Sequence, residues 1–135
     1  MANFSLKDAK YADIIRVKIR DDYYHYGIFE NENSVYEFGS AKDAFKTDSK
    51  DISVINVTIK EFLDGKFLEV REYSLKEKFK KNKPDIIIKK AKERLGEKGY
   101  NIISNNCLHF VNECVFNKKD IKWLEGIKNP SFYLF

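Results

Sequence analysis

Two cysteines, two histidines and one glutamate are the residues of this 135-residue chain whose types and spacing suit nucleophilic chemistry. Cys107 follows Ser104, Asn105 and Asn106, which are all good helix N-cap residues. A helix beginning there would point its unpaired N–H groups and the positive end of its dipole at Cys107, which favours a thiolate. Cys114 lies two turns further on and gains no such help. Cysteine is also among the most buried residue types, so a packing role for Cys107 stays open on this evidence alone.

A catalytic thiol needs a base, and the two histidines are unequal candidates. His109 is two positions from Cys107, about 200° around a helix, so the two side chains point apart and we expect His109 only to support the site. His25 falls in a predicted strand. A hairpin with a three-residue loop within 30–33 puts His25 and Glu37 on one face of the sheet, opposite or one diagonal apart. Glu37 would then orient His25; the alternative is an exposed surface glutamate.

The elements that must position these residues fall into two groups. Alternating or apolar segments predict strands at 12–20, 23–29, 35–39, 52–59 and 66–73. Helical spacing then follows, in a helix opened by Pro84 and in a second one that begins at Cys107. Strands first and helices later indicate an α+β fold, with an antiparallel sheet of about five strands packed against helices. The length fits a single domain over 1–135, and Trp123 and Leu124 should pack back on its core.

Charge is spread unevenly, since residues 71–135 carry 15 basic and 8 acidic side chains. The densest run, 76–83, is interpreted first as a solvated loop. Alternatively, the basic 76–92 region makes peripheral contact with an anionic membrane. No aromatic-rich RNA motif accompanies it, so nucleic acid is not expected as a partner. The chain shows no signal peptide or transmembrane segment, and its two cysteines are too far apart for a disulfide, which predicts a cytoplasmic protein.

Several strings match one family in order and spacing. The segments "YADIIRVKI", "YYHYGIF" and "VYEFG" resemble the opening of the lecithin:retinol acyltransferase-like family. The block "LGEKGYNIISNNCLHFVNECVFN" resembles its hallmark, in which N-C-x-H-F-V-N is the most specific part. The resemblance covers roughly 11–117. It implies a circularly permuted papain-like fold, related to the NlpC-type cell-wall peptidases, with the histidine strand first and the cysteine helix last.

The resemblance also implies a chemistry. Family members with known activity attack glycerophospholipid esters, carry the acyl group as a thioester on cysteine, and pass it to water, an amine or an alcohol. By position, Cys107 would be the nucleophile, His25 its base, and Tyr23 would lie near the oxyanion. The chain departs from the pattern where a second histidine usually stands, because that position is Glu37. It also has Leu108 in place of a glutamate.

The sequence thus leads to one hypothesis with two rivals. Cys107 attacks an acyl ester or phospholipid, His25 moves the proton and Glu37 orients His25. The N–H groups that follow Asn106, together with the Tyr23 hydroxyl, stabilise the oxyanion. No cofactor is implied, and the histidines and cysteines lack the spacing of metal ligands. The rivals are a cysteine peptidase or amidase of the NlpC type, and a non-catalytic binding or effector module with a protein partner.

Overall fold

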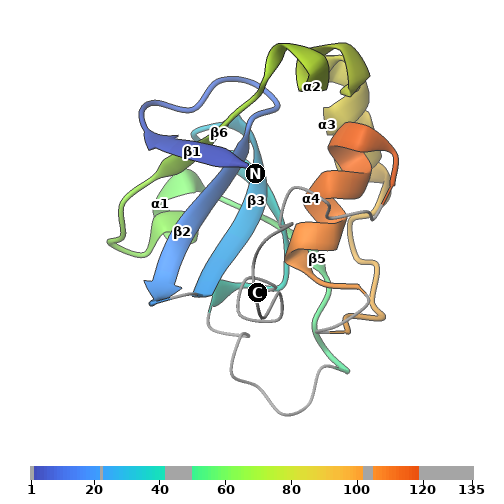
Figure 1. Ribbon diagram of the computed structural model, residues 1–135. Coiled ribbons are helices and arrows are strands. Elements are labelled where there is room, and N and C mark those ends of the chain that lie inside the picture. Colours follow the sequence, from blue (N-terminus) through green and yellow to red (C-terminus); the bar gives the residue numbers. More distant parts are fainter. Residues whose placement is uncertain (1, 22, 42–49, 102–104, 119–135) are drawn as a thin grey trace.

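A six-stranded antiparallel sheet forms the centre of the molecule (Figure 1). The computed structural model describes residues 2–21, 23–41, 50–101 and 105–118. The strands are β1 (Asn3–Leu6), β2 (Ile14–Arg20), β3 (Tyr23–Asn31), β4 (Ser34–Phe38), β5 (Val54–Val57) and β6 (Glu69–Glu72). They lie in the order β1-β6-β2-β3-β4-β5, so the hairpin of β3 and β4 lies toward one end of the sheet.

The helices cover both faces of this sheet (Figure 1). They are α1 (Ile59–Leu63), α2 (Leu75–Lys80), α3 (Pro84–Glu93) and α4 (Cys107–Phe116). Helices α3 and α4 lie together on one side and α1 lies on the other. Each helix is started by a local signal: Pro begins α3, while side-chain caps begin the other three. The sheet is thus the middle layer between two unequal helical layers.

Two apolar clusters hold the layers together, because strand side chains alternate between the two faces. Tyr26 and Ile28 of β3 pack in the larger cluster with Phe110 of α4. Ile15 and Val17 of β2 pack in the smaller cluster, to which α1 contributes its one buried side chain, Phe62. Because of this alternation, consecutive residues of β2 or β3 lie on opposite faces of the sheet and have different surroundings.

The predicted α+β class is confirmed, and each of the five predicted strand segments contains a strand. The sheet has one strand more than expected, because β1 pairs with β6, whose residues lie 63 to 69 positions further along the chain. The interpretation of 76–83 as a loop is wrong over its first part, since Leu75–Lys80 is helical. Trp123 and Leu124 lie outside the described residues.

This architecture fits the papain-like fold expected from the sequence, while the circular permutation stays a prediction. Among the helices in the described part of the chain, none has both the length and the apolar character needed to cross a bilayer.

Candidate active site

A β-bulge sets the faces on which His25 and Glu37 lie. Strands β3 and β4 pair Ile28 with Tyr36, but next to the turn the pairing is shifted by one residue at Glu30. Because side chains alternate along a strand, a one-residue shift moves every following side chain to the other face. Continuing the register from Ile28 leaves His25 one diagonal from Glu37, on the same face. The bulge at Glu30 therefore allows these two side chains to meet.

His25 and Glu37 form a buried hydrogen-bonded pair. His25 Nε2 lies 2.5 Å from Glu37 Oε1, and the two residues are 1% and 2% exposed. A carboxylate only accepts hydrogen bonds, so the Nε2–H group donates. The opposite ring nitrogen, Nδ1, remains for other partners. Glu37 thus holds the imidazole in one orientation, with Nε2 protonated.

Phe62 and Gly27 complete the wall around the imidazole. The Phe62 ring of α1 lies with its centroid 5.4 Å from that of His25. Gly27 leaves room for this contact, since a Cβ at that position would lie 2.8 Å from Phe62 Cε1 and 3.0 Å from the Tyr36 carbonyl oxygen. An alanine would therefore push against the ring that packs on His25.

Cys107 is the first residue of α4, and its neighbours fix this helix start. Asn106 is the N-cap: its Oδ1 accepts hydrogen bonds from the N–H groups of Leu108 and His109, at 3.0 and 3.1 Å. His109 Nδ1 in turn accepts from the Asn106 N–H, at 3.2 Å. Asn106 and His109 therefore hold the helix end that carries Cys107, and His109 has its Nδ1 engaged there.

The electrostatics of His25 connect the three residues. Burial lowers the pKa of His25, but hydrogen bonds and electrostatic interactions with Cys107 and Glu37 raise the pKa more strongly, from 6.5 to about 10. The imidazole is thus protonated at neutral pH. Since Glu37 holds Nε2, Nδ1 is the nitrogen that remains for Cys107. The structure brings Cys107, His25 and Glu37 into one cluster.

The other candidate residues lie around this cluster in different ways. Tyr23 is two residues before His25 on β3, half-buried, with the Arg20 guanidinium 4.7 Å from its ring centroid. Cys114 is 1% exposed, and burial raises the pKa of its thiol to about 12. Cys114 is therefore a protonated thiol of the core at neutral pH.

A cleft on the α1 side reaches the residues that contact His25. Its volume is about 360 Å³, and both Glu37 and Phe62 belong to its lining. The remaining lining residues are Ser40, Ala41, Ile55, Val57, Glu61 and Asp64. Cys107 itself is 0% exposed. The Cys107 side chain is therefore covered by its neighbours.

Metal binding has no support within the described ranges, where no group of three or more His, Cys, Asp or Glu side chains is arranged to hold an ion.

Sequence reasoning did not find Phe62 or Gly27 as parts of the site. Gly27 carried a signal, because a glycine inside a strand of bulky residues often marks a close approach. Phe62 carried none, since its contact with His25 depends on how α1 packs across the sheet.

Comparison with known proteins decides the family. The model of the family described as lecithin retinol acyltransferase matches residues 7–120, most of the chain. The chain belongs to the lecithin retinol acyltransferase family. Membership suggests, in broad terms, a thiol enzyme of the acyltransferase kind. No curated protein matches the chain.

Proposed function

We propose that this member of the lecithin retinol acyltransferase family is a cysteine-dependent acyl-transfer enzyme that forms a thioester on Cys107. The observation that supports the proposal best is the buried cluster in which His25 hydrogen-bonds to Glu37 on one side and interacts with Cys107 on the other. A nucleophile, a base and a group that orients the base are the three parts that covalent acyl transfer requires.

In the first half-reaction, the Cys107 sulfur attacks the acyl carbon of an ester. The tetrahedral intermediate collapses, the ester C–O bond breaks, and the His25 imidazolium gives its proton to the departing alkoxide. The Cys107 N–H, as the first in α4, has no acceptor within the helix and is the first candidate donor to the developing oxyanion. Tyr23 is a candidate second donor.

In the second half-reaction, the thioester passes to an acceptor. His25, now neutral, takes a proton from water, an alcohol or an amine as that group attacks the acyl carbon. The C–S bond breaks, the product leaves, and the Cys107 thiolate and the His25 imidazolium are regenerated. Glu37 keeps its hydrogen bond to Nε2 through both half-reactions and stabilises the imidazolium each time it forms.

Family membership supports an ester, with phospholipid as the first substrate class to test. The test is a panel of phospholipid, thioester and peptide substrates, measured with the native protein and with Cys107→Ala and His25→Ala. We expect acyl release from the ester or thioester, lost in both variants. Cleavage of peptides alone would favour an amidase, and an equally active Cys107→Ala would end the proposal.

A matched thiol control is available within the chain. Iodoacetamide should label Cys107 far faster than Cys114 at neutral pH, because Cys107 lies beside the protonated His25 imidazole, whereas burial raises the pKa of the Cys114 thiol to about 12. Equal labelling of the two thiols would contradict a special role for Cys107.

A further inference from the structure

Helix α2 (Leu75–Lys80) presents an apolar face that the protein itself does not cover. None of its residues is buried. Leu75 is 73% and Phe79 83% exposed, although both are large and apolar. They are four positions apart and so lie on the same side of the helix. Because α2 contributes no side chain to the core, its exposed apolar face points to a role other than packing.

The helix is held firmly despite its exposed face. Ser74 and Glu77 form a capping box at its start, and the Glu77 carboxylate also forms an ion pair with the buried Arg71 guanidinium of β6. Beyond its end, the Asn82 N–H donates to the Val115 carbonyl oxygen of α4, at 2.7 Å. Both ends of α2 are therefore attached to the body, and the outer face is presented in a fixed orientation.

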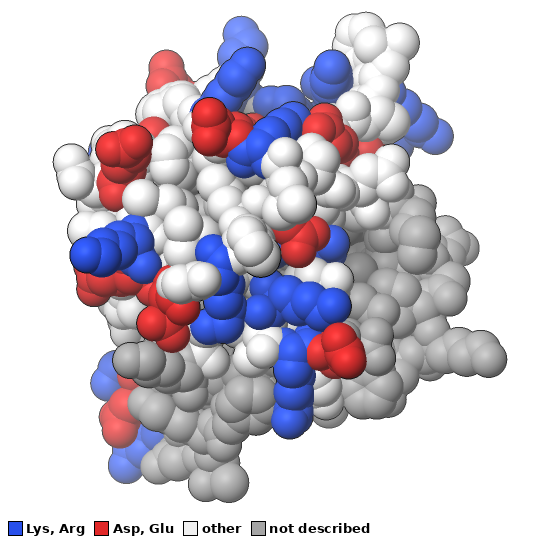
Figure 2. All heavy atoms as spheres, turned by 90° about the vertical axis from the view of Figure 1, so that its left-hand side faces the viewer, with Lys and Arg blue, Asp and Glu red and all other residues white. Residues whose placement is uncertain are grey.

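The surroundings of this face are strongly basic. Lys76, Lys78 and Lys80 of α2 and Lys83 after it are exposed. The only acidic residue of α2, Glu77, is already paired with Arg71. Figure 2 shows Lys and Arg side chains around a protruding uncharged group at the top of the molecule, where α2 lies in Figure 1.

The basic surface is narrower than the sequence suggested. Within the 76–92 region, two of the three α3 lysines have acidic partners: Lys92 Nζ lies 3.4 Å from Glu30 Oε2, and Lys89 Nζ lies 4.0 Å from Glu93 Oε1. Uncompensated positive charge is therefore concentrated on α2 and the turn that follows it, next to the two exposed apolar side chains.

We propose that α2 docks on an anionic lipid bilayer. Leu75 and Phe79 enter the headgroup and acyl boundary, while the lysines beside them contact anionic headgroups. A nucleic acid would bind the lysines but would offer no apolar partner to the aliphatic Leu75 side chain. The pairing of apolar side chains with lysines on one short helix therefore favours lipid.

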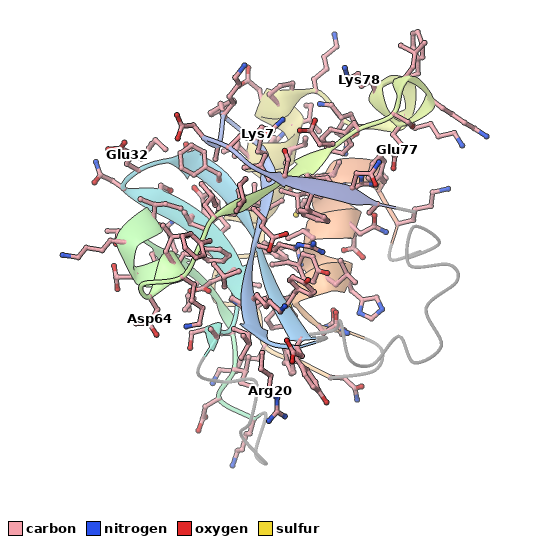
Figure 3. All side chains as sticks on the ribbon, turned by 60° about the vertical axis from the view of Figure 1, so that its left-hand side comes forward. Lys7, Arg20, Glu32, Asp64, Glu77 and Lys78 are labelled. Carbon is pink, nitrogen blue, oxygen red and sulfur yellow. The ribbon has the colours of Figure 1, made fainter. Side chains whose placement is uncertain are left out.

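This docking is independent of the thiol chemistry. Asn82 ties the end of α2 to Cys114 and Val115, near the end of α4, whereas Cys107 begins α4. In Figure 3 the labelled Lys78 lies at the opposite end of the molecule from Arg20, which pairs with the first residue of β3. Vesicle binding should therefore not require Cys107.

The experiment is flotation of the full chain with phosphatidylcholine vesicles, with and without phosphatidylserine. We expect binding that needs phosphatidylserine and weakens as salt rises. Phe79→Ser should weaken the partition at least about tenfold. Phe67→Ser is the matched control, because Phe67 is also 83% exposed but lies between α1 and β6. It should leave binding unchanged.

A charge series completes the test. Replacing Lys76, Lys78 and Lys80 by Gln should weaken binding about fivefold for each lysine, whereas Lys89→Gln on α3 should have a smaller effect. Because all these side chains are exposed, the far-ultraviolet circular dichroism should not change.

Three results would each overturn the docking proposal. The first is equal partition of Phe79→Ser and Phe67→Ser, and the second is equal binding to vesicles with and without phosphatidylserine. The third is tight, lysine-dependent binding of an oligonucleotide by a protein that does not bind the vesicles. Loss of acyl transfer in Cys107→Ala, with vesicle binding retained, would leave docking supported and separate from catalysis.

Discussion

The hydrogen bond from His25 to Glu37 gives the sharpest test of the site, through Glu37→Gln. Glutamine has the same shape and can still accept from Nε2–H, but it carries no charge. The substitution therefore removes the electrostatic part of the contact and keeps its geometry. Since both residues are nearly fully buried, solvent cannot screen the change.

The magnitude follows from the raised pKa of His25. It stands at about 10 instead of 6.5, with Cys107 and Glu37 raising it against burial. An adjacent opposite charge shifts a pKa by about 1–3 units, so the variant should titrate His25 at about 7–9. One unit corresponds to about 1.36 kcal/mol, so the native fold should lose about 1.4–4 kcal/mol at neutral pH.

The assay is NMR titration of the imidazole signals, which are simple because the chain has two histidines. Denaturant unfolding of the same samples gives the free energy. Glu93→Gln is the control, since Glu93 lies on the exposed side of α3 and its partner is Lys89. Glu37→His restores the residue usual in the family and should keep activity with a lower pKa for His25.

Two outcomes would refute this reasoning about His25. The first is a native His25 that titrates near 6.5, because an imidazolium at neutral pH would then be absent. The second is an identical titration in the native protein and in Glu37→Gln, because Glu37 would then not act on His25 at all.

Three further predictions follow from the same contacts. Gly27→Ala should cost about 1–3 kcal/mol in the free energy of unfolding, measured by denaturant titration, because its Cβ would meet Phe62 and a carbonyl oxygen. Cys114→Ala should leave the alkylation rate of Cys107 unchanged, and a slowed rate would show that the two thiols are coupled. Stability should fall at alkaline pH: the raised pKa of His25 contributes fully below 6.5 and is lost as pH rises through about 10. Unfolding experiments across this range that show constant stability would contradict it.

The hairpin shows how far sequence reasoning reached. The predicted hairpin placed His25 and Glu37 on one face of the sheet, and the observed register agrees. The turn differs from the predicted three-residue loop, because β3 ends at Asn31 and β4 begins at Ser34. A bulge at Glu30 then restores the register that places His25 and Glu37 on one face. Alternation along each strand is a local property that can be read from the sequence, whereas a bulge depends on how the two strands pair.

Sequence reasoning missed two elements for different reasons. Helix α2 is only six residues long, its one apolar repeat is Leu75 and Phe79, and the capping-box pattern of Ser74 and Glu77 was a local signal that could have found it. Strand β1 is four residues long and depends on pairing with β6, distant in the chain. Strand β1 is therefore recognised by its contact with β6, which no local pattern encodes.

The roles of Asn106 and His109 illustrate an intermediate case. The sequence predicted an N-cap region before Cys107 and a His109 side chain that points away from Cys107. The structure shows Asn106 and His109 in one capping box. The sequence did not predict the reciprocal hydrogen bond from the Asn106 N–H to His109 Nδ1, because Glu or Gln usually occupies the third helical position of a capping box.

The most direct test of the proposed chemistry is the intact mass of the protein after brief exposure to an activated ester or a short-chain phospholipid. We predict the addition of one acyl group, located on Cys107 by peptide mapping and removed by hydroxylamine, as a thioester would be. It should be absent from Cys107→Ala and accumulate in His25→Ala only far more slowly. An acyl group on Cys114, or no acyl group on Cys107 while substrate is turned over, would contradict the account.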